Sequence, residues 1–423
     1  MLDIRFIREN PELVRDGLRK KRVEFPLDEL LAIEEERRRM LHEGEVLKAE
    51  RNSVSEEIAK AKRAGQDAAE RIAAMRAVGD KIAAIDESVR GVDAKLDDLL
   101  LRIPNMPHAS VPEGIGAEDN VPVRSGGPAI AFDFPARAHW EVGEALGILD
   151  LARAAKISGS GFSLLRGAGA KLSRALINWM LDIHTTENGY EEVAPPHLVL
   201  RSTMTGTGQL PKMEEDMYRT DLDDLFLIPT AEVPVTNIYR DEILEPDDLP
   251  RKFVAYTPCY RREAGSAGKE TRGMTRVHQF DKVELVKLVR PETSYDELES
   301  LLGNATSLLD RLELPYRVIT LCTGDLSFGA AKCYDIEVMS PASGKWLEVS
   351  SCSNFEDFQA RRMNLRFRPG AKEKPRFVHT LNGSALALPR VIIGIIENCQ
   401  TKDGKVRIPA VLRPYMGGLE LIG

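Results

Sequence analysis

The sequence has only five cysteines among its 423 residues, and no two of them form a Cys-x-x-Cys pair. This scarcity argues against a disulfide framework and against a zinc site, so we expect reduced, buried thiols. No run approaches the roughly 20 consecutive apolar residues that a membrane-spanning helix needs. The N-terminal segment is charged throughout and lacks the apolar core of a signal peptide. We therefore expect a cytoplasmic protein with no membrane partner.

Two further absences narrow the way in which the chain can bind nucleotides. The formal net charge is -8, which argues against a generally cationic coat for nucleic acid, so any RNA contact must use local patches. The phosphate-binding pattern GxxxxGK[ST] is also absent, so ATP binding cannot be argued through that fold. With 43% apolar residues, the chain has ample material for more than one domain.

Residues 27–103 carry the apolar spacing of a long helical hairpin. In the second half of this segment, apolar side chains recur at alternating intervals of three and four residues, as in two packed helices. The first half has a looser stripe of the same kind. Residues 64–67 provide a turn, with Asp67 as the expected N-cap of the second helix. Each helix of roughly 35 residues would be about 50 Å long.

The charge along this hairpin is uneven. Residues 27–103 hold 14 basic and 18 acidic side chains, whereas the distal part, residues 48–81, holds 8 basic and 6 acidic ones. By charge alone this pattern favours an ordinary solvated coiled coil, and a phosphate-binding surface is the alternative. The cationic residues at the distal end are Lys60, Lys62, Arg63, Arg71 and Arg76.

The most distinctive stretch lies between residues 251 and 289, where two β-rich arms flank a loop. Residues on one face of a strand alternate, so Phe280, Lys282 and Glu284 share a side. Phe280 can stack on a base, while Glu284, about 13 Å further along, reaches a second ligand. An ordinary hairpin with a solvated loop is equally compatible with this pattern. The loop contains glycine and cationic residues, namely Gly265, Gly268, Lys269, Arg272 and Gly273.

These arms resemble motif 2 of class II aminoacyl-tRNA synthetases, and specifically of the seryl-tRNA synthetase family. They contain Arg261-Arg262-Glu263 and, at residues 277–284, the run Val-His-Gln-Phe-Asp-Lys-Val-Glu. Residues 188–196 resemble motif 1, which forms the homodimer interface in the family. Residues 381–390 precede an apolar helical run and resemble motif 3. Pro389 stands where many relatives carry glycine, and proline suits a first helical turn.

The resemblance spans essentially the whole chain and implies a fold of the α+β class. It implies a long antiparallel helical hairpin, or coiled coil, at the N-terminus, followed by a class II catalytic domain built on an antiparallel sheet. The alternation of β-like and helical runs after residue 135 favours the same class. The expected domains are a tRNA-binding helical arm at 1–104, a linker and start of the body at 105–135, and the catalytic domain at 136–423.

The resemblance also implies functional residues. Arg261 and Arg390 are expected to be catalytic, gripping the α-phosphate and the γ-phosphate end of ATP. Mg²⁺, bound with ATP, is expected on Glu348 and Ser351, and we expect no zinc. The expected serine-binding residues are Thr230, Ala231, Glu232, Glu284 and Ser384. The expected ATP-binding residues are Arg261, Arg262, Glu263, Val277, Phe280, Glu348, Val349, Ser350, Ser351 and Arg390. The expected tRNA-binding residues are Lys60, Lys62, Arg63, Arg71 and Arg76.

The implied function is that of a serine–tRNA ligase. Such an enzyme activates L-serine with ATP to seryl-adenylate and transfers serine to the 3′ end of tRNA(Ser), with the tRNA bound across the subunits of a homodimer. Whether tRNA(Sec) is also a substrate stays open. A carrier-protein ligase is disfavoured because such relatives lack the long arm. An inactive scaffold is disfavoured because it would have lost Arg261, Glu263, Glu284 or Arg390, which are all present.

Overall fold

The chain folds into two compact units, which we describe separately. One consists of Leu2–Leu18 and Val23–Ile103, and the other of Met1, Arg19–Arg22 and Pro104–Gly423. The structure is a computed structural model that describes residues 1–264 and 272–423. None of the helices in these two ranges is both long and apolar enough to cross a membrane.

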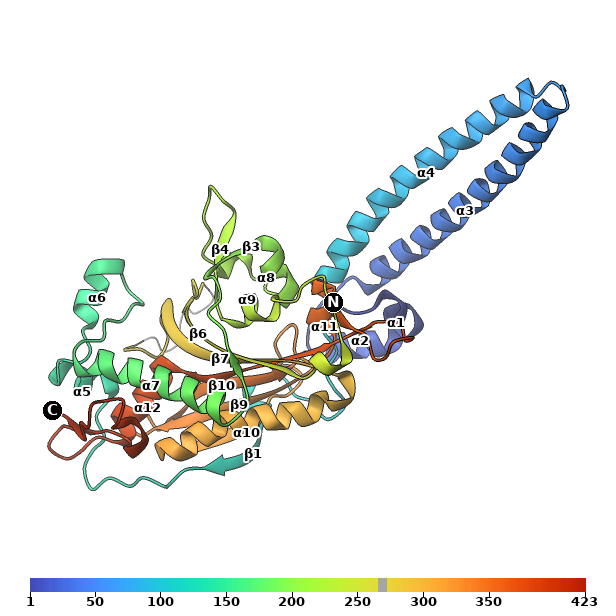
Figure 1. The fold of residues 1–423 in the computed structure, drawn as a ribbon. Coiled ribbons are helices and arrows are strands. Elements are labelled where there is room, and N and C mark those ends of the chain that lie inside the picture. Colours follow the sequence, from blue (N-terminus) through green and yellow to red (C-terminus); the bar gives the residue numbers. More distant parts are fainter. Residues whose placement is uncertain (265–271) are drawn as a thin grey trace. The chain divides into compact units, whose positions relative to one another are not determined.

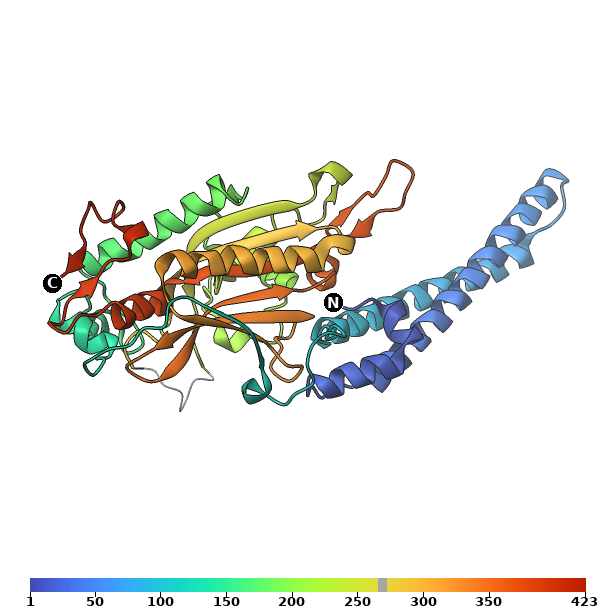
Figure 2. The same cartoon turned by 90° about the horizontal axis from the view of Figure 1, so that it is seen from below.

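The N-terminal unit is dominated by a hairpin of two long antiparallel helices, as the apolar spacing predicts (blue in Figures 1 and 2). The helices contain 37 and 34 residues, close to the predicted length. On the second helix, the buried residues Ile82, Val89 and Leu96 recur every seven positions and form the seam. The helices of this segment are α1 (Ile4–Glu9), α2 (Pro11–Lys20), α3 (Leu27–Arg63) and α4 (Ala69–Arg102).

Polar contacts tie the two arm helices together and close their turn. Lys48 on α3 forms an ion pair with Asp86 on α4 at 2.9 Å, and Arg37 pairs with Asp93 in the same way. At the turn, an oxygen of the Asp67 carboxylate accepts the backbone N–H of Ala69 at 2.9 Å. The N-cap of α4 is Ala68, one residue later than the expected Asp67, but the Asp67 carboxylate still satisfies one of the free N–H groups at the start of the helix.

The larger unit is built on an eight-stranded sheet in which every neighbouring pair is antiparallel except β2 and β6. This confirms the α+β class and the antiparallel sheet. One of the β-like runs of the sequence, residues 333–338, lies within a strand of this sheet. In spatial order the strands are β1 (Val121–Gly126), β8 (Tyr316–Thr320), β9 (Lys332–Ser340), β10 (Lys345–Asn354), β13 (His379–Ala387), β7 (Gln279–Val289), β6 (Arg251–Tyr260) and β2 (Glu191–Glu192).

Three helices pack on one face of this sheet, and one of them, α10, packs against β13, β10 and β7 (orange in Figure 2). Buried leucines of α10 recur at helical spacing and join a large apolar core with α7, α12 and the strands. The helices of the larger unit are α5 (His139–Ala145), α6 (Leu151–Ser158), α7 (Ala168–Thr186), α8 (Arg201–Thr207), α9 (Glu232–Thr236), α10 (Ser294–Leu312), α11 (Phe358–Met363) and α12 (Leu388–Asn398).

The alternation of side chains along β7 separates the core from the opposite face of the sheet. Val283, Leu285 and Val289 belong to the apolar core under the helices, whereas Val286 and Leu288 belong to a second core on the other side. The strands β3 (Leu198–Leu200), β4 (Leu225–Leu227), β5 (Ile243–Leu244), β11 (Arg366–Phe367), β12 (Arg376–Phe377), β14 (Val406–Arg407) and β15 (Leu421–Ile422) complete the fold with the short 3-10 helices η1 (Ala117–Asp119), η2 (Glu214–Asp216), η3 (Pro246–Asp248), η4 (Pro291–Thr293) and η5 (Ala410–Leu412).

Candidate active site

A cavity of about 290 Å³ lies on the face of the sheet opposite α7, α10 and α12. Strands β7, β10 and β13 form its floor, and the first turn of α12 forms part of its wall. Most residues that the sequence assigns to ATP and serine line this single cavity. Those lining residues are Thr230, Glu232, Arg261, Glu263, Val277, Phe280, Glu284, Glu348, Val349, Ser351, Ser384 and Arg390.

Arg261 follows the last residue of β6 and is fixed by both its backbone and its side chain. Its backbone N–H donates to the carbonyl of His278 at 2.9 Å, and its Nε donates to the carbonyl of Pro229 at 3.3 Å. The guanidinium carbon lies 5.1 Å from the centre of the Phe280 ring. A cation held beside an aromatic face suits a ligand that carries both phosphate and a flat base.

Arg390 reaches the same cavity from the first turn of α12. Its Nη1 donates to the carbonyl of Glu348 at 2.8 Å and lies 3.4 Å from the carboxylate of that residue. Its Nε donates to the carbonyl of Thr275 at 3.3 Å. Arg261 and Arg390 therefore face one cavity and can neutralise two parts of one polyphosphate.

Local irregularities in two strands turn additional side chains toward the cavity. The pairing of β10 with β9 shifts between Glu348 and Ser350, and Glu348, Val349 and Ser351 all reach the cavity. The pairing of β13 with β7 shifts between Ser384 and Ala387, and Leu386 has a positive φ of 77°. Such bulges re-aim side chains beside functional sites.

The opposite end of the cavity is a buried polar cluster around Glu284, which is 2% exposed. Lys282 forms an ion pair with the Glu284 carboxylate and donates to the Thr230 hydroxyl at 2.7 Å. The Ser384 hydroxyl donates to the same carboxylate at 3.4 Å. Sequence reasoning placed Lys282 on the correct face of the strand but assigned it no role.

Glu232 is a second buried carboxyl in this cluster. Burial, followed by the charge of Glu284, raises the pKa of Glu232 to about 7. The amide of Gln359 donates to Glu232 at 2.7 Å, and the Thr380 hydroxyl in turn donates to the Gln359 carbonyl oxygen at 2.6 Å. Sequence reasoning missed Gln359, because it comes from α11 and no local pattern marks it.

The oxygen donors proposed for a metal lie at the phosphate end. The Glu348 side chain is 46% exposed, and the Ser351 hydroxyl lies 3.1 Å from the Cys333 sulfur. Burial, followed by the charge of Glu348, raises the pKa of nearby Asp335 well above its ordinary value. Over residues 1–264 and 272–423, no three His, Cys, Asp or Glu side chains cluster as a metal site. Mg²⁺ carried by phosphates needs only one or two protein oxygens, so the donor set fits that ion.

Several residues assigned from the sequence lie elsewhere. Ala231 is fully buried in a small core, and the Ser350 hydroxyl donates to the carbonyl of Ser384 at 2.6 Å, so neither lines the cavity. Arg262 is exposed, and its guanidinium donates to the carbonyl of Glu215 at 3.0 Å. Gly265, Gly268 and Lys269 fall outside the described residues. Exposed positions on α3 and α4 hold all of the residues assigned to tRNA, namely Lys60, Lys62, Arg63, Arg71 and Arg76.

Comparison with known proteins agrees with this geometry. Residues 1–107 match the family profile described as the seryl-tRNA synthetase N-terminal domain, and residues 213–399 match the tRNA synthetase class II core domain (G, H, P, S and T). The serine--tRNA ligase of Thermomicrobium roseum is 56% identical over 423 residues, which cover 100% of this chain and 95% of that protein. The serine--tRNA ligase of Geobacter sulfurreducens is 55% identical over 423 residues, with 100% of both chains covered.

Solved structures give the same result. The crystal structure of seryl-tRNA synthetase from Pyrococcus horikoshii complexed with ATP matches with a TM-score of 0.95 and 43% identity, covering 100% of this chain and 99% of that one. The cytoplasmic serine-tRNA ligase from Naegleria fowleri, in complex with AMP, matches with a TM-score of 0.89 and 28% identity, covering 100% and 98% of the two chains. From its sequence, its fold and the residues gathered in its cavity, the chain belongs to the seryl-tRNA synthetases, the serine-specific family of class II aminoacyl-tRNA ligases.

Proposed function

We propose that the cavity over β7, β10 and β13 is where this ligase joins L-serine to ATP and then to tRNA(Ser). The observation that carries this assignment is the convergence of Arg261, Arg390 and Glu284 on one cavity of about 290 Å³. Cationic groups stand at one end of it and a buried carboxylate at the other, so one molecule of ATP and one amino acid can meet between them.

In the first step, a carboxylate oxygen of serine attacks the α-phosphorus of ATP. A bond forms between that oxygen and phosphorus, and the bond to the bridging oxygen of pyrophosphate breaks. Because the attacking carboxylate is already an anion, the step needs alignment and charge neutralisation more than a general base. Arg261 would hold the α-phosphate and Arg390 the γ-phosphate end, each through a planar pair of N–H donors.

In the second step, a hydroxyl of the terminal adenosine of the tRNA attacks the activated carbonyl, and AMP leaves. The adenine of ATP, which becomes that of the adenylate, would lie against Phe280 in both steps. The centre of the Phe280 ring is 5.1 Å from the guanidinium carbon of Arg261. Glu263, which pairs with Arg276, would meet the edge of the base.

Serine would be recognised at the buried end of the cavity. Glu284 would accept the ammonium group, and Ser384, with Glu232 or Thr230, would bond the side-chain hydroxyl. Alanine would leave these buried polar groups without a partner, and a site built to bond a hydroxyl rejects an analogue that lacks it. Threonine would be excluded by steric fit, where one methyl group is worth only about 1–3 kcal/mol.

Magnesium would enter with ATP. Glu348 and Ser351 would supply its protein oxygens, and both line the phosphate end of the cavity. When bound, the ion would neutralise charge on the phosphates as pyrophosphate leaves. The neighbouring Arg390, 3.4 Å from the Glu348 carboxylate, would share that task from the protein side.

The cationic end of the arm would hold the tRNA through its phosphates, which provide affinity with little reading of the bases. The resemblance of residues 188–196 to motif 1 supports a homodimer, and we propose that the tRNA bridges its subunits. We also propose that the enzyme acts in the cytoplasm.

An ATP–pyrophosphate exchange screen across the amino acids tests the assignment, followed by charging of purified tRNA(Ser) and tRNA(Sec). We expect serine to support exchange far better than alanine or threonine, and tRNA(Ser) to accept serine. Faster exchange with any other amino acid would contradict the proposed substrate.

A further inference from the structure

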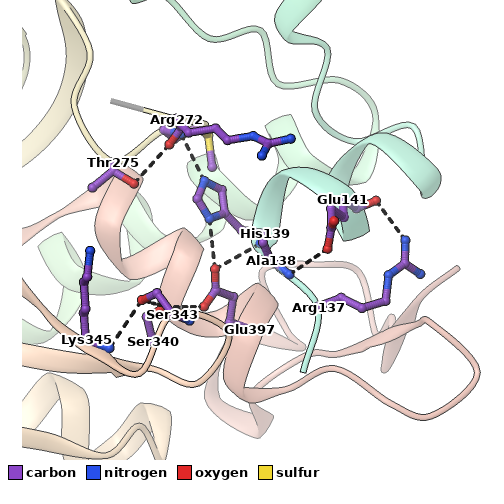
Figure 3. Close-up of polar contacts among 12 residues, drawn as sticks. Arg137, Ala138, His139, Glu141, Arg272, Thr275, Ser340, Ser343, Lys345 and Glu397 are labelled. Carbon is purple, nitrogen blue, oxygen red and sulfur yellow. Dashed lines mark hydrogen bonds and ion pairs between the residues drawn. The ribbon is translucent and has the colours of Figure 1, made fainter. Parts of the chain in front are cut away.

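A buried histidine outside the cavity connects two parts of its wall. His139 is the first residue of α5 and is 1% exposed, and Glu397, near the end of α12, is 2% exposed. Both the backbone nitrogen and Nδ1 of His139 lie 3.0 Å from Oε1 of Glu397 (Figure 3). On the other side of the ring, the backbone N–H of Met274 points to Nε2 at 3.0 Å.

These contacts fix the protonation of the imidazole ring. A backbone N–H can only donate, so Nε2 of His139 must be the acceptor. The ring proton is therefore on Nδ1 and is donated to Glu397. Burial acts to raise the pKa of Glu397, but hydrogen bonds from His139 and Ser340 outweigh it and leave that pKa below its ordinary value. The carboxylate is thus the anionic acceptor that this arrangement requires.

Residues 272–275, the segment held by His139, lead directly into the nucleotide cavity. Met274, Thr275, Arg276 and Val277 all line it. The Thr275 carbonyl accepts a hydrogen bond from Nε of Arg390 at 3.3 Å. Arg390 and Glu397 belong to the same helix, α12, so the bonds form a closed circuit from α12 through α5 and this segment back to α12.

The fit around the ring is tight. A Cβ atom added to Gly273, whose φ is +72°, would lie 2.1 Å from Nε2 of His139, so only glycine allows the chain to pass here. The guanidinium carbon of Arg272 lies 4.7 Å from the centre of the Trp140 ring. The segment therefore rests on α5 through three consecutive residues, Arg272, Gly273 and Met274.

We propose that His139 is a positioning residue that sets the segment 272–275, and through the Thr275 carbonyl the Arg390 guanidinium, in place for ATP. This inference rests on the proposed role of Arg390 in holding the triphosphate. If the role of His139 were purely structural, its substitution would lower the folding stability. Any kinetic loss would then follow from the lower stability. A positioning residue predicts instead a specific effect on ATP that depends on the bond to Met274.

Two substitutions at residue 139 separate the two bonds of the ring. In His139→Asn, the amide nitrogen can still donate to Glu397, but no atom reaches the N–H of Met274. In His139→Gln, the longer side chain brings its carbonyl oxygen to the position of Nε2 and gives up the bond to Glu397. As a control, Ser340→Ala removes another donor to Glu397, which the Ser340 hydroxyl reaches at 2.5 Å, without touching the segment.

Serine-dependent ATP–pyrophosphate exchange and thermal unfolding of the full-length chain test the proposal. For His139→Asn we expect the KM for ATP to rise about tenfold, the effect of an unsatisfied buried donor, with the KM for serine changed by less than about twofold. For His139→Gln and Ser340→Ala we expect a KM for ATP within about threefold of the parent, despite lower unfolding temperatures.

Gly273→Ala breaks the same contact from the other side, because its Cβ would push the segment and the His139 ring apart. We expect it to raise the KM for ATP as His139→Asn does, and to lower thermal stability as well because of its positive φ. Equal KM values for ATP in His139→Asn and the parent would overturn the proposal. It would also be overturned if, across all variants, the rise in KM for ATP simply followed the fall in unfolding temperature. Failure of the parent chain to exchange with serine would instead overturn the proposed function, so the two outcomes are distinguishable.

Discussion

At the scale of single residues, strand alternation predicts which side chains of β7 share a face, whereas the family resemblance implies most of the other site residues. Phe280, Lys282 and Glu284 line the cavity together, as their spacing of two requires. Gln359 and His139 escape prediction because each reaches its partner from a distant element: Gln359 bonds Glu232 and His139 bonds Glu397. Such contacts depend on the tertiary fold and leave no local signature in the sequence.

Glu232 gives the folded chain a dependence on pH. Its pKa is about 7 when folded, against an ordinary 4.5, so the folded state binds the proton more tightly. The resulting stability is fully present below pH 4.5 and is lost as the pH rises through about 7. Relative to the parent, the free energy of unfolding of Glu232→Gln should therefore rise by more than about 1 kcal/mol between pH 5 and pH 8.

Thermal unfolding of both chains at the two pH values measures this difference. Glutamine keeps an oxygen to accept from the Gln359 amide but cannot ionise, so the comparison isolates the charge. Glu29→Gln, at an exposed position, serves as the control and should show no such gain. If the difference in free energy of unfolding between Glu232→Gln and the parent were the same at pH 5 and pH 8, the buried, proton-binding state of Glu232 would be refuted.

At the scale of secondary-structure elements, periodicity predicts the existence of the elements better than their irregularities. The seven-residue repeat of Ile82, Val89 and Leu96 gives the arm hairpin. The bulges at Glu348–Ser350 and Ser384–Ala387 have no comparable signal. They matter because Val349 belongs to the core and also reaches the cavity. A strict alternation would assign it to one face only.

The distal part of the arm can be tested by reversing its charge. Exchanging Lys60, Lys62 and Arg63 for glutamate should raise the KM for tRNA at least about tenfold, because cationic contacts to phosphates are lost. Serine-dependent ATP–pyrophosphate exchange, which needs no tRNA, should stay at the parental rate. Aminoacylation at several tRNA and salt concentrations measures the effect.

A matched triple reversal controls for overall charge. Arg39, Arg90 and Lys95 are also exposed on α3 and α4 but lie away from the turn. Their exchange for glutamate makes the same change in net charge and should raise the KM for tRNA much less. Equal effects of the two triple variants would argue against a tRNA site at the distal end.

At the scale of the whole molecule, the proposal is that each tRNA is held by the arm of one subunit and charged by the cavity of the other. Mixed dimers distinguish this from charging within one subunit. One subunit carries the reversal of Lys60, Lys62 and Arg63, and its partner carries Glu284→Ala. If the tRNA crosses subunits, the intact arm of the Glu284→Ala subunit still serves the intact cavity of its partner. About half of the activity therefore survives.

The complementary dimer carries both sets of changes in one subunit and none in the other. A tRNA that crosses subunits then always meets either a defective arm or a defective cavity, so charging should be lost. Binding within one subunit predicts the reverse for both dimers. Aminoacylation by tagged and purified mixed dimers therefore gives opposite answers for the two arrangements, and a monomer in sedimentation would exclude both dimeric schemes.

The most direct test of the account is serine-dependent ATP–pyrophosphate exchange by a Glu284→Ala chain. Glu284 is the buried anion at the amino-acid end of the cavity, and without it the serine ammonium would have no counter-charge. Exchange should fall by about 10²-fold or more, while calorimetric binding of ATP, governed by Arg261 and Arg390, persists. Exchange at the parental rate would contradict the placement of serine beside ATP in this cavity.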